Sequence, residues 1–114
     1  FIVANFAELY NSDTEGAKLY RELFKKSGTD EKVMGMYNFY GFMTAMVLVE
    51  GLERAGKRLT REKLITAMEG IKNWDGMGVF PGLSYGPNDR AGTEAVALVA
   101  IKDGKQQIIS DWIK

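Results

Sequence analysis

Large apolar side chains fill the middle of the chain almost without interruption. From Asn38 to Gly56 the sequence reads NFYGFMTAMVLVEGLERAG, with no charged residue before Glu50. A helix that is apolar nearly all round is buried on several sides. We therefore predict a core helix with Asn38 as its N-cap and Gly56 as its C-cap, packed on a large partner such as a β-sheet. A membrane span would need about 20 apolar residues, and Glu50 comes too soon for that.

Two amphipathic stretches predict helices on either side of this core helix. Ser12-Asp13-Thr14-Glu15 fits a capping box, in which Glu15 reaches back to the Ser12 amide, and the helix that follows should end at Gly28. Thr60 is the predicted N-cap of the other helix, which carries apolar residues at helical spacing as far as Ile71.

The remaining segments predict strands and turns. Phe1–Ala4 is a short apolar run typical of a strand buried on both faces, and Val33–Met36 fits a brief strand before the core helix. Closely spaced Gly, Pro, Asn and Asp residues between positions 72 and 92 favour turns and short extended pieces. The sequence therefore mixes helices with strands, and helices should cover a sheet.

The C-terminal part of the sequence predicts a β-hairpin. Ala95 to Ile101 alternates in the manner of a strand, and Asp103-Gly104 is a two-residue type I′ turn signal. Lys105 to Ile113 then supplies the returning strand.

Composition removes several classes of function. The 114 residues contain 15 basic and 15 acidic side chains, so the formal charge is zero and no nucleic-acid or anionic-membrane partner is indicated. The absence of Cys and His removes disulfides, thiolate chemistry, the usual zinc sites and His-based triads. We expect no metal and no cofactor. Carboxylate or lysine chemistry is not excluded by composition, and the expectation that the chain is not an enzyme rests on its resemblance to a known family.

Patterns that superficially suggest catalysis have simpler interpretations. Gly76-Met77-Gly78 lacks the Gly-Lys-Ser/Thr ending of a phosphate-binding P-loop. The acidic pairs Asp30-Glu31 and Glu50/Glu53 are interpreted as hydrated side chains on a loop and at a helix end.

Tyr37 is the most interesting candidate for ligand contact. The N-terminal end of a buried helix presents free amides and the positive end of the helix dipole, which favour an anionic group such as a carboxylate. A tyrosine at that end offers an apolar wall together with a hydroxyl donor. Plain packing of Tyr37 is the alternative interpretation.

The order of motifs along the chain resembles one protein family. The motifs are the Tyr-led helix Tyr40–Gly56, the Thr-capped Thr60–Ile71, Trp74-Asp75-Gly76, GPNDRAG at Gly86–Gly92, and the strand with Lys-Asp-Gly-Lys at Val96–Lys105. Together they resemble the C-terminal part of type I periplasmic substrate-binding proteins of the branched-chain amino acid transporter class. The match covers nearly the whole chain.

This resemblance implies a fold and a place within it. The chain would be an α/β, partial Rossmann-like lobe, with helices packed on a sheet and a C-terminal β-hairpin. Residues 1–114 would form a single fragment, the C-terminal third of a two-lobed protein. Residues 1–5 and 96–114 would lie near the interlobe crossovers, and residues 6–95 mainly in the first lobe. Because the chain begins at Phe1 inside an apolar run, we likewise expect a longer parent chain.

The resemblance also implies a function. The parent protein would bind a small solute between its lobes and deliver it to an ABC transporter permease, in the periplasm or tethered at the cell surface. Family ligand contacts map here to Phe6, Met36, Tyr37 and Asn38. The segment Tyr37-Asn38-Phe39-Tyr40 is more aromatic than a site for aliphatic ligands requires, which argues against leucine-like cargo and leaves open an aromatic carboxylate or amide as well as another amino-acid-like ligand. The main amino-acid clamp of the family lies upstream and is absent.

Three alternatives remain at the level of sequence. The same fold serves as the ligand-sensing domain of receptors and regulators. A fragment of an α/β enzyme would have to rely on carboxylate or lysine chemistry, and an independent small interaction domain would fold as a monomer. A fragment, by contrast, should expose sheet edges and form homo-oligomers or aggregates.

Overall fold

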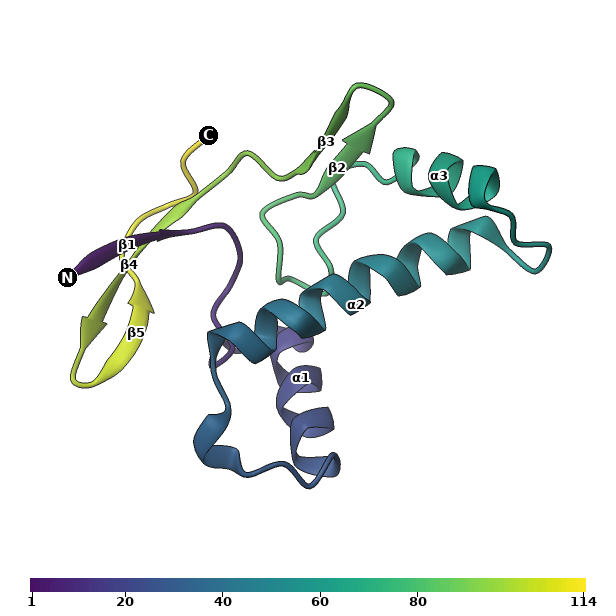
Figure 1. Cartoon of the computed structure of the whole chain (residues 1–114). Helices are drawn as coiled ribbons and strands as arrows, with labels where there is room; N and C mark the ends of the chain where they lie inside the picture. Colours follow the sequence, from purple (N-terminus) through teal and green to yellow (C-terminus); the bar gives the residue numbers. More distant parts are fainter.

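The computed structural model describes all residues, 1–114, and combines three α-helices with five short strands. In chain order the elements are β1 (Ile2–Asn5), α1 (Glu15–Lys26), the 3₁₀ turn η1 (Glu31–Val33), α2 (Met36–Ala55), α3 (Arg61–Glu69), β2 (Ser84–Gly86), β3 (Asp89–Gly92), β4 (Ala97–Lys102) and β5 (Lys105–Ile108). The sheet of β1, β4 and β5 lies at one end of the molecule with both chain termini beside it, and the helices occupy the rest (Figure 1). The predicted α/β class, with helices packed against strands and a closing hairpin, is confirmed.

The three-stranded sheet is antiparallel, with β4 in the middle. β1 pairs with β4 so that Asn5 lies opposite Ala97, and β4 pairs with β5 across the predicted hairpin. Asp103 and Gly104 both have positive φ (52° and 74°), as a type I′ turn requires. The regular pairing of the returning strand ends at Ile108, and Ile113 rejoins Val96 as an isolated bridge.

The prediction that Phe1–Ala4 is buried on both faces is wrong for this chain. Phe1 is 91% exposed and Ile2 60% exposed, and only Asn5 at the end of β1 is buried. Val3, 38% exposed, faces the start of α2 across a hollow, so residues 1–114 cover this apolar run only in part.

The N-cap of helix α1 lies two residues after the predicted one. Thr14, not Ser12, is the N-cap, and its hydroxyl accepts a hydrogen bond from the Ala17 amide at 3.3 Å. Ser12 instead bonds the Thr14 hydroxyl at 3.0 Å, so the predicted capping box does not form. The predicted end is confirmed, since the helix stops at Lys26 and Gly28 follows with φ of 72°.

The start of α2 also differs from the prediction. No strand forms at Val33–Met36, because residues 31–33 make a 3₁₀ turn whose N-cap, Asp30, accepts from the Lys32 amide. The helix begins at Met36 with Gly35 as N-cap, so Asn38 lies inside the first turn. The predicted C-terminal glycine is confirmed: Gly56 caps the helix with φ of 77°.

Only one face of α2 is buried in this chain. Phe39, Met43, Val47 and Gly51 recur every four residues on the covered side, whereas Leu48 and Val49 are about half exposed. The predicted burial on several sides is therefore wrong within residues 1–114. None of the helices combines the length and the apolar character needed to cross a bilayer.

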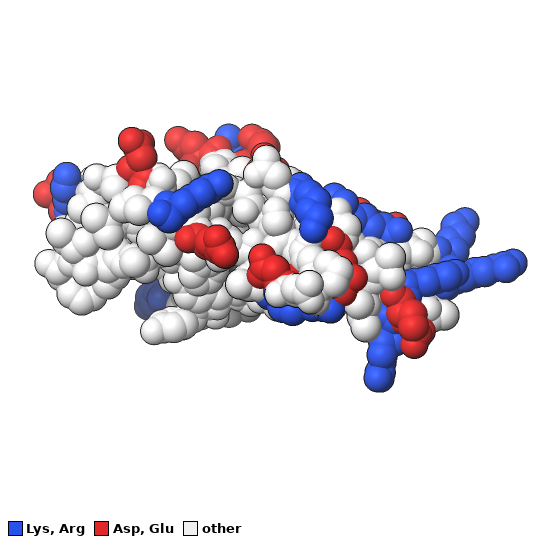
Figure 2. Space-filling model, turned by 90° about the horizontal axis from the view of Figure 1, so that it is seen from above, with Lys and Arg blue, Asp and Glu red and all other residues white.

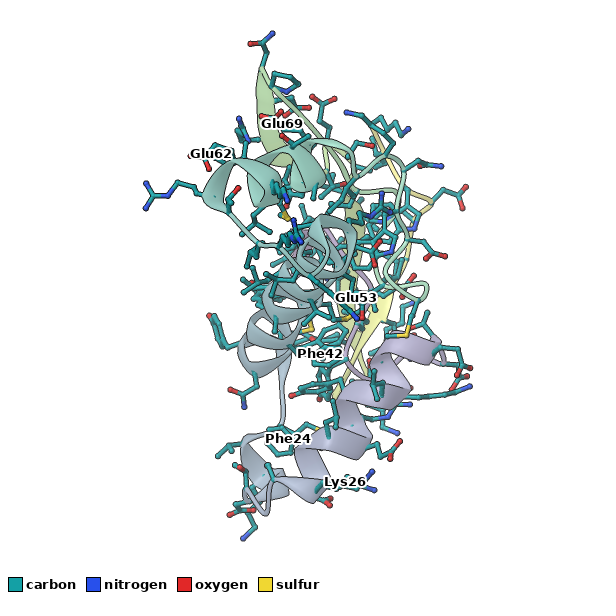
Figure 3. All side chains as sticks on the ribbon, turned by 90° about the vertical axis from the view of Figure 1, so that its right-hand side faces the viewer. Phe24, Lys26, Phe42, Glu53, Glu62 and Glu69 are labelled. Carbon is teal, nitrogen blue, oxygen red and sulfur yellow. The ribbon has the colours of Figure 1, made fainter.

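One hydrophobic cluster joins the helices to the turn-rich segment. Phe39 of α2 is fully buried against Tyr20 of α1, with ring centroids 5.0 Å apart. Figure 3 shows Phe24 and Phe42 in the space beside these helices, and both pack on the same cluster. Its buried members are Ala7, Ala17, Tyr20, Phe39, Met43, Val47, Ile71, Val79, Phe80 and Leu83, and none of them belongs to β1, β4 or β5.

Helix α3 and the turns after it follow the sequence prediction. The Thr60 hydroxyl accepts from the Lys63 amide, which confirms the cap. The helix ends at Glu69, two residues short of the predicted Ile71, and packs against α2 where Gly51 leaves room for the Met68 side chain. Residues 72–92 form turns and the short β2–β3 hairpin.

Candidate functional site

Three aromatic side chains cluster where the chain leaves β1 and where α2 begins. The Phe6 and Tyr40 rings stack with centroids 5.2 Å apart and planes inclined by 25°. Tyr37 meets Tyr40 edge-on, with centroids 6.3 Å apart. Both arrangements are favourable for aromatic pairs. Tyr40 thus connects two of the residues that the sequence predicted as ligand contacts, Phe6 and Tyr37.

A polar contact fixes the orientation of Tyr40. Its hydroxyl donates to the Asn5 side-chain oxygen at 2.9 Å, and the Asn5 amide group donates to the Ala7 carbonyl at 2.8 Å. Asn5 is 5% exposed and is the one polar side chain among the buried residues. Burial raises the pKa of the Tyr40 hydroxyl, and the neighbouring Tyr37 raises it further. The hydroxyl therefore stays a neutral donor at physiological pH.

A cavity of about 190 Å³ lies between the sheet and the start of α2. It is lined by Val3, Ala4, Asn5, Leu9, Met36, Tyr37, Tyr40, Val99 and Gln106. Its walls are mainly apolar, and Asn5, Gln106 and the two tyrosines supply the polar groups. Binding sites for small molecules combine apolar walls with a few polar groups in this way, although their volume is typically about 300–1,000 Å³. On this scale the cavity is small for a complete binding site.

Tyr37 is the most accessible of these residues. Its side chain is 90% exposed beside the first turn of α2, where backbone N–H groups have no acceptor within the helix. A ligand carboxylate at this end would meet free amide donors and a favourable helix dipole. The site thus offers an aromatic surface next to anion-binding amides.

The four predicted contact residues do not all share the cavity. Met36 and Tyr37 line it together, whereas Phe6 faces a separate groove on the other side of Tyr40. Asn38 lines neither hollow, and its side-chain amide donates to the Val33 carbonyl at 2.6 Å. In this structure Asn38 therefore holds the 3₁₀ turn against the start of α2.

The groove that Phe6 faces is larger and more apolar. Its volume is about 460 Å³, and it runs along the half-exposed side of α2. Phe6, Tyr40, Met43, Thr44, Val47, Leu48, Met68, Phe80, Leu83, Tyr85, Ala91 and Thr93 line it. It carries no charged side chain, so it is suited to packing against other apolar residues.

Charged residues lie away from both hollows. Acidic and basic side chains alternate over the face in Figure 2, and several basic ones project at the end where α2 and α3 meet. The His/Cys/Asp/Glu side chains nowhere gather into a group of three that could hold a metal ion. Electrostatics at the candidate site are therefore set by helix amides and neutral hydroxyl and amide groups.

Asn5, Tyr40 and Gln106 belong to the site but were not predicted as ligand contacts. From the sequence, Asn5 is interpreted as the first residue of a loop after an apolar run, and Tyr40 as part of the hydrophobic core. The signal that could have identified Asn5 is its place as a polar residue directly after an apolar run. Gln106 reaches the cavity because β5 pairs with β4 in a register that sets Gln106 opposite Ile101, and its sequence neighbours give no sign of this.

Comparison with known proteins identifies one family. The family model described as "Periplasmic binding protein" matches residues 1–106. A search of curated proteins found no match. Among solved structures, the chain is similar to one described as a branched chain amino acid ABC transporter from Thermus thermophilus with bound valine, with a TM-score of 0.85 and 24% identity. The similarity covers 99% of this chain and 33% of that one, so the chain spans about a third of its structural relative.

Proposed function

Because the chain belongs to the periplasmic binding protein family, we propose that it forms part of the solute-binding component of an ABC importer. The parent protein is a binding protein and not an enzyme. It binds a small solute between two lobes and delivers it to the permease. In this proposal residues 6–95 belong mainly to the first lobe, and residues 1–5 and 96–114 lie near the crossovers between the lobes.

The observation that carries this proposal is the aromatic cluster at the junction of two structural units. The sheet of β1, β4 and β5 shares no residue with the hydrophobic cluster of the helices, and the cavity beside Tyr37 lies between them. A site between two units changes shape when the units move, and hinge closure around a ligand depends on such a site.

The chemistry at the junction favours an amino-acid-like ligand or an aromatic carboxylate or amide. The first-turn amides of α2 suit a carboxylate or an amide oxygen. Tyr37 and Tyr40 present ring surface to the apolar part of the ligand, and Asn5 and Gln106 are the neutral polar groups beside it. The cavity is smaller than most ligand pockets, which supports a second wall from the rest of the parent chain.

The partners follow from this role. They are the remaining two thirds of the parent chain, the small solute and the permease, in the periplasm or at the cell surface. The Cα atoms span only 18 Å along the shortest axis of the molecule, so α2 is left uncovered on one side. The open apolar groove along α2 is where further parent-chain residues are expected to pack.

Thermal unfolding of the full-length protein tests the proposal. L-valine, L-leucine, L-phenylalanine and benzoate are added singly, and at least one should raise Tm. Tyr37→Ala should abolish the shift, because the exposed ring is the surface offered to the ligand, and its ligand-free Tm is measured as the baseline. Tyr37→Phe separates the ring from the hydroxyl, and Leu59→Ala, half exposed before α3, is the control. A Tm unmoved by every compound counts against the proposal.

A further inference from the structure

The three-stranded sheet and the helical unit (residues 6–95) share few direct polar contacts. The buried members of the hydrophobic cluster come from the helical unit alone. Across all 114 residues, one hydrogen bond connects β1, β4 or β5 with a helix, and it runs from the Tyr40 hydroxyl to Asn5. The units are further joined by the chain after Asn5, by the chain before Ala97, and by apolar packing where the buried Val99 faces the cavity beside Met36 and Tyr40.

We propose that the Tyr40–Asn5 hydrogen bond positions helix α2, and with it Tyr37, relative to the sheet. Asn5 and Tyr40 are then positioning residues for the ligand site. This inference rests on the proposed function only for its effect on ligand binding; the mechanical connection itself does not depend on it.

Asn5 is placed to hold both sides of the joint. Its backbone pairs with Ala97 in the sheet, and two residues later Ala7 is fully buried in the helical cluster. The Asn5 amide group spans this short segment by donating to the Ala7 carbonyl at 2.8 Å. The side chain is therefore held in one orientation, with its oxygen directed at Tyr40.

Tyr40 is held from two directions by the same segment. The Asn5 side-chain oxygen accepts a hydrogen bond from the Tyr40 hydroxyl, and Phe6 stacks on the Tyr40 ring. If α2 rotated away from the sheet, the Asn5 oxygen would lose its partner in a buried position, which is costly. Glu8 then anchors the segment to the turns, since its amide donates to the Val79 carbonyl at 2.8 Å. On this side of the joint, movement between the units is thereby limited to residues 5–8, and the chain before Ala97 is the other connection.

Tyr40→Phe removes the hydroxyl and keeps the ring that stacks on Phe6. Its matched control is Tyr20→Phe, which also removes a partly buried tyrosine hydroxyl, but one that donates to the Gly35 carbonyl inside the helical unit. The two variants make the same chemical change, one across the joint and one away from it. Both are compared with the unmodified full-length protein.

Hydrogen–deuterium exchange of the ligand-free protein is the first measurement. Tyr40→Phe should exchange at least threefold faster at residues 2–8 and 97–102, with protection of residues 39–51 unchanged. Tyr20→Phe should leave residues 2–8 and 97–102 as in the unmodified protein. Equal exchange of Tyr40→Phe and the unmodified protein at these segments overturns the inference.

Titration with L-phenylalanine and L-valine is the second measurement, and it separates the two proposals. Tyr40→Phe should weaken binding of whichever probe binds by at least threefold, while Tyr20→Phe should not. If neither probe binds but exchange accelerates, the positioning role stands and the choice of solute fails. If a probe binds both proteins equally and exchange is unchanged, the solute-binding function stands and the positioning role fails.

Discussion

Gly16 is the residue at which one added methyl group should be most disruptive. It is buried in the first turn of α1, and its amide donates to the Met77 carbonyl at 3.0 Å. A Cβ atom there would collide with the Val79 side chain and would lie 3.0 Å from the Gly76 carbonyl oxygen. Because backbone cannot swing aside as a flexible side chain can, Gly16→Ala should push α1 away from the 76–79 turn.

The size of this effect follows from three contributions. Overpacking of a tight contact costs about 1–3 kcal/mol. Weakening the Gly16–Met77 hydrogen bond costs about 1 kcal/mol more. Ala is favoured over Gly in a helix by up to about 1 kcal/mol, which offsets part of the loss. Gly16→Ala should therefore destabilise the protein by about 2 kcal/mol.

Gly41→Ala makes the same substitution where there is space. Gly41 is exposed in the middle of α2, and nothing lies within 4 Å of the added Cβ. Within residues 1–114 only the helix preference remains, which favours Ala by about 0.5–1 kcal/mol. Destabilisation of the full-length Gly41→Ala variant would instead indicate that parent-chain residues pack on this face of α2. Urea unfolding of the full-length proteins, followed by far-UV circular dichroism, measures both changes. A Gly16→Ala midpoint at or above that of the unmodified protein would refute the steric argument.

Three further changes test other parts of the structure. Phe39→Ala empties the centre of the hydrophobic cluster and should cost about 3–5 kcal/mol in urea unfolding; a loss under 1 kcal/mol would contradict its central place. Burial raises the pKa of Glu8 above its ordinary 4.5, so its favourable contribution to folding is complete below pH 4.5 and is lost as the pH rises through the folded-state pKa. Glu8→Gln should accordingly raise the urea midpoint at pH 7 and leave it unchanged at pH 4, and the opposite pH dependence would disprove this assignment. Gly104→Ala places a Cβ at φ of 74° and should cost about 1 kcal/mol, seen as faster amide exchange in β4 and β5; unchanged exchange would argue against the type I′ turn.

Local signals in the sequence predicted the start of α3, the ends of α1 and α2, and the hairpin turn. Thr60 and Gly56 cap their helices through hydrogen bonds to residues within one turn. The Asp103-Gly104 turn depends only on the backbone angles of these two residues. Each was therefore readable without knowledge of the rest of the fold. The prediction of Asn38 as the N-cap was wrong because its side chain donates a hydrogen bond to the preceding Val33 carbonyl. Gly35 is the N-cap instead and makes no side-chain capping bond.

Burial and the site geometry could not be read in the same way. An apolar run such as Phe1–Ala4 shows that a partner is needed, but it does not show that the same chain supplies one. The contact between Tyr40 and Asn5 joins residues 35 positions apart, and no spacing rule connects them. The sequence predicted Tyr37 near a helix start. The cavity beside it could not be predicted, because half of its wall comes from the sheet.

The pairing of β1 with β4 has a consequence for the order of folding. Asn5 and Ala97 are partners separated by 92 positions, so zipping them together from an unfolded chain would close a very long loop. That closure costs roughly 4 kcal/mol of chain entropy. Condensation of the intervening helices brings the two ends together beforehand, because Ala7 is anchored in the same cluster as Leu83. The sheet should therefore be the last part to acquire its structure and the first to be lost under mechanical or chemical stress.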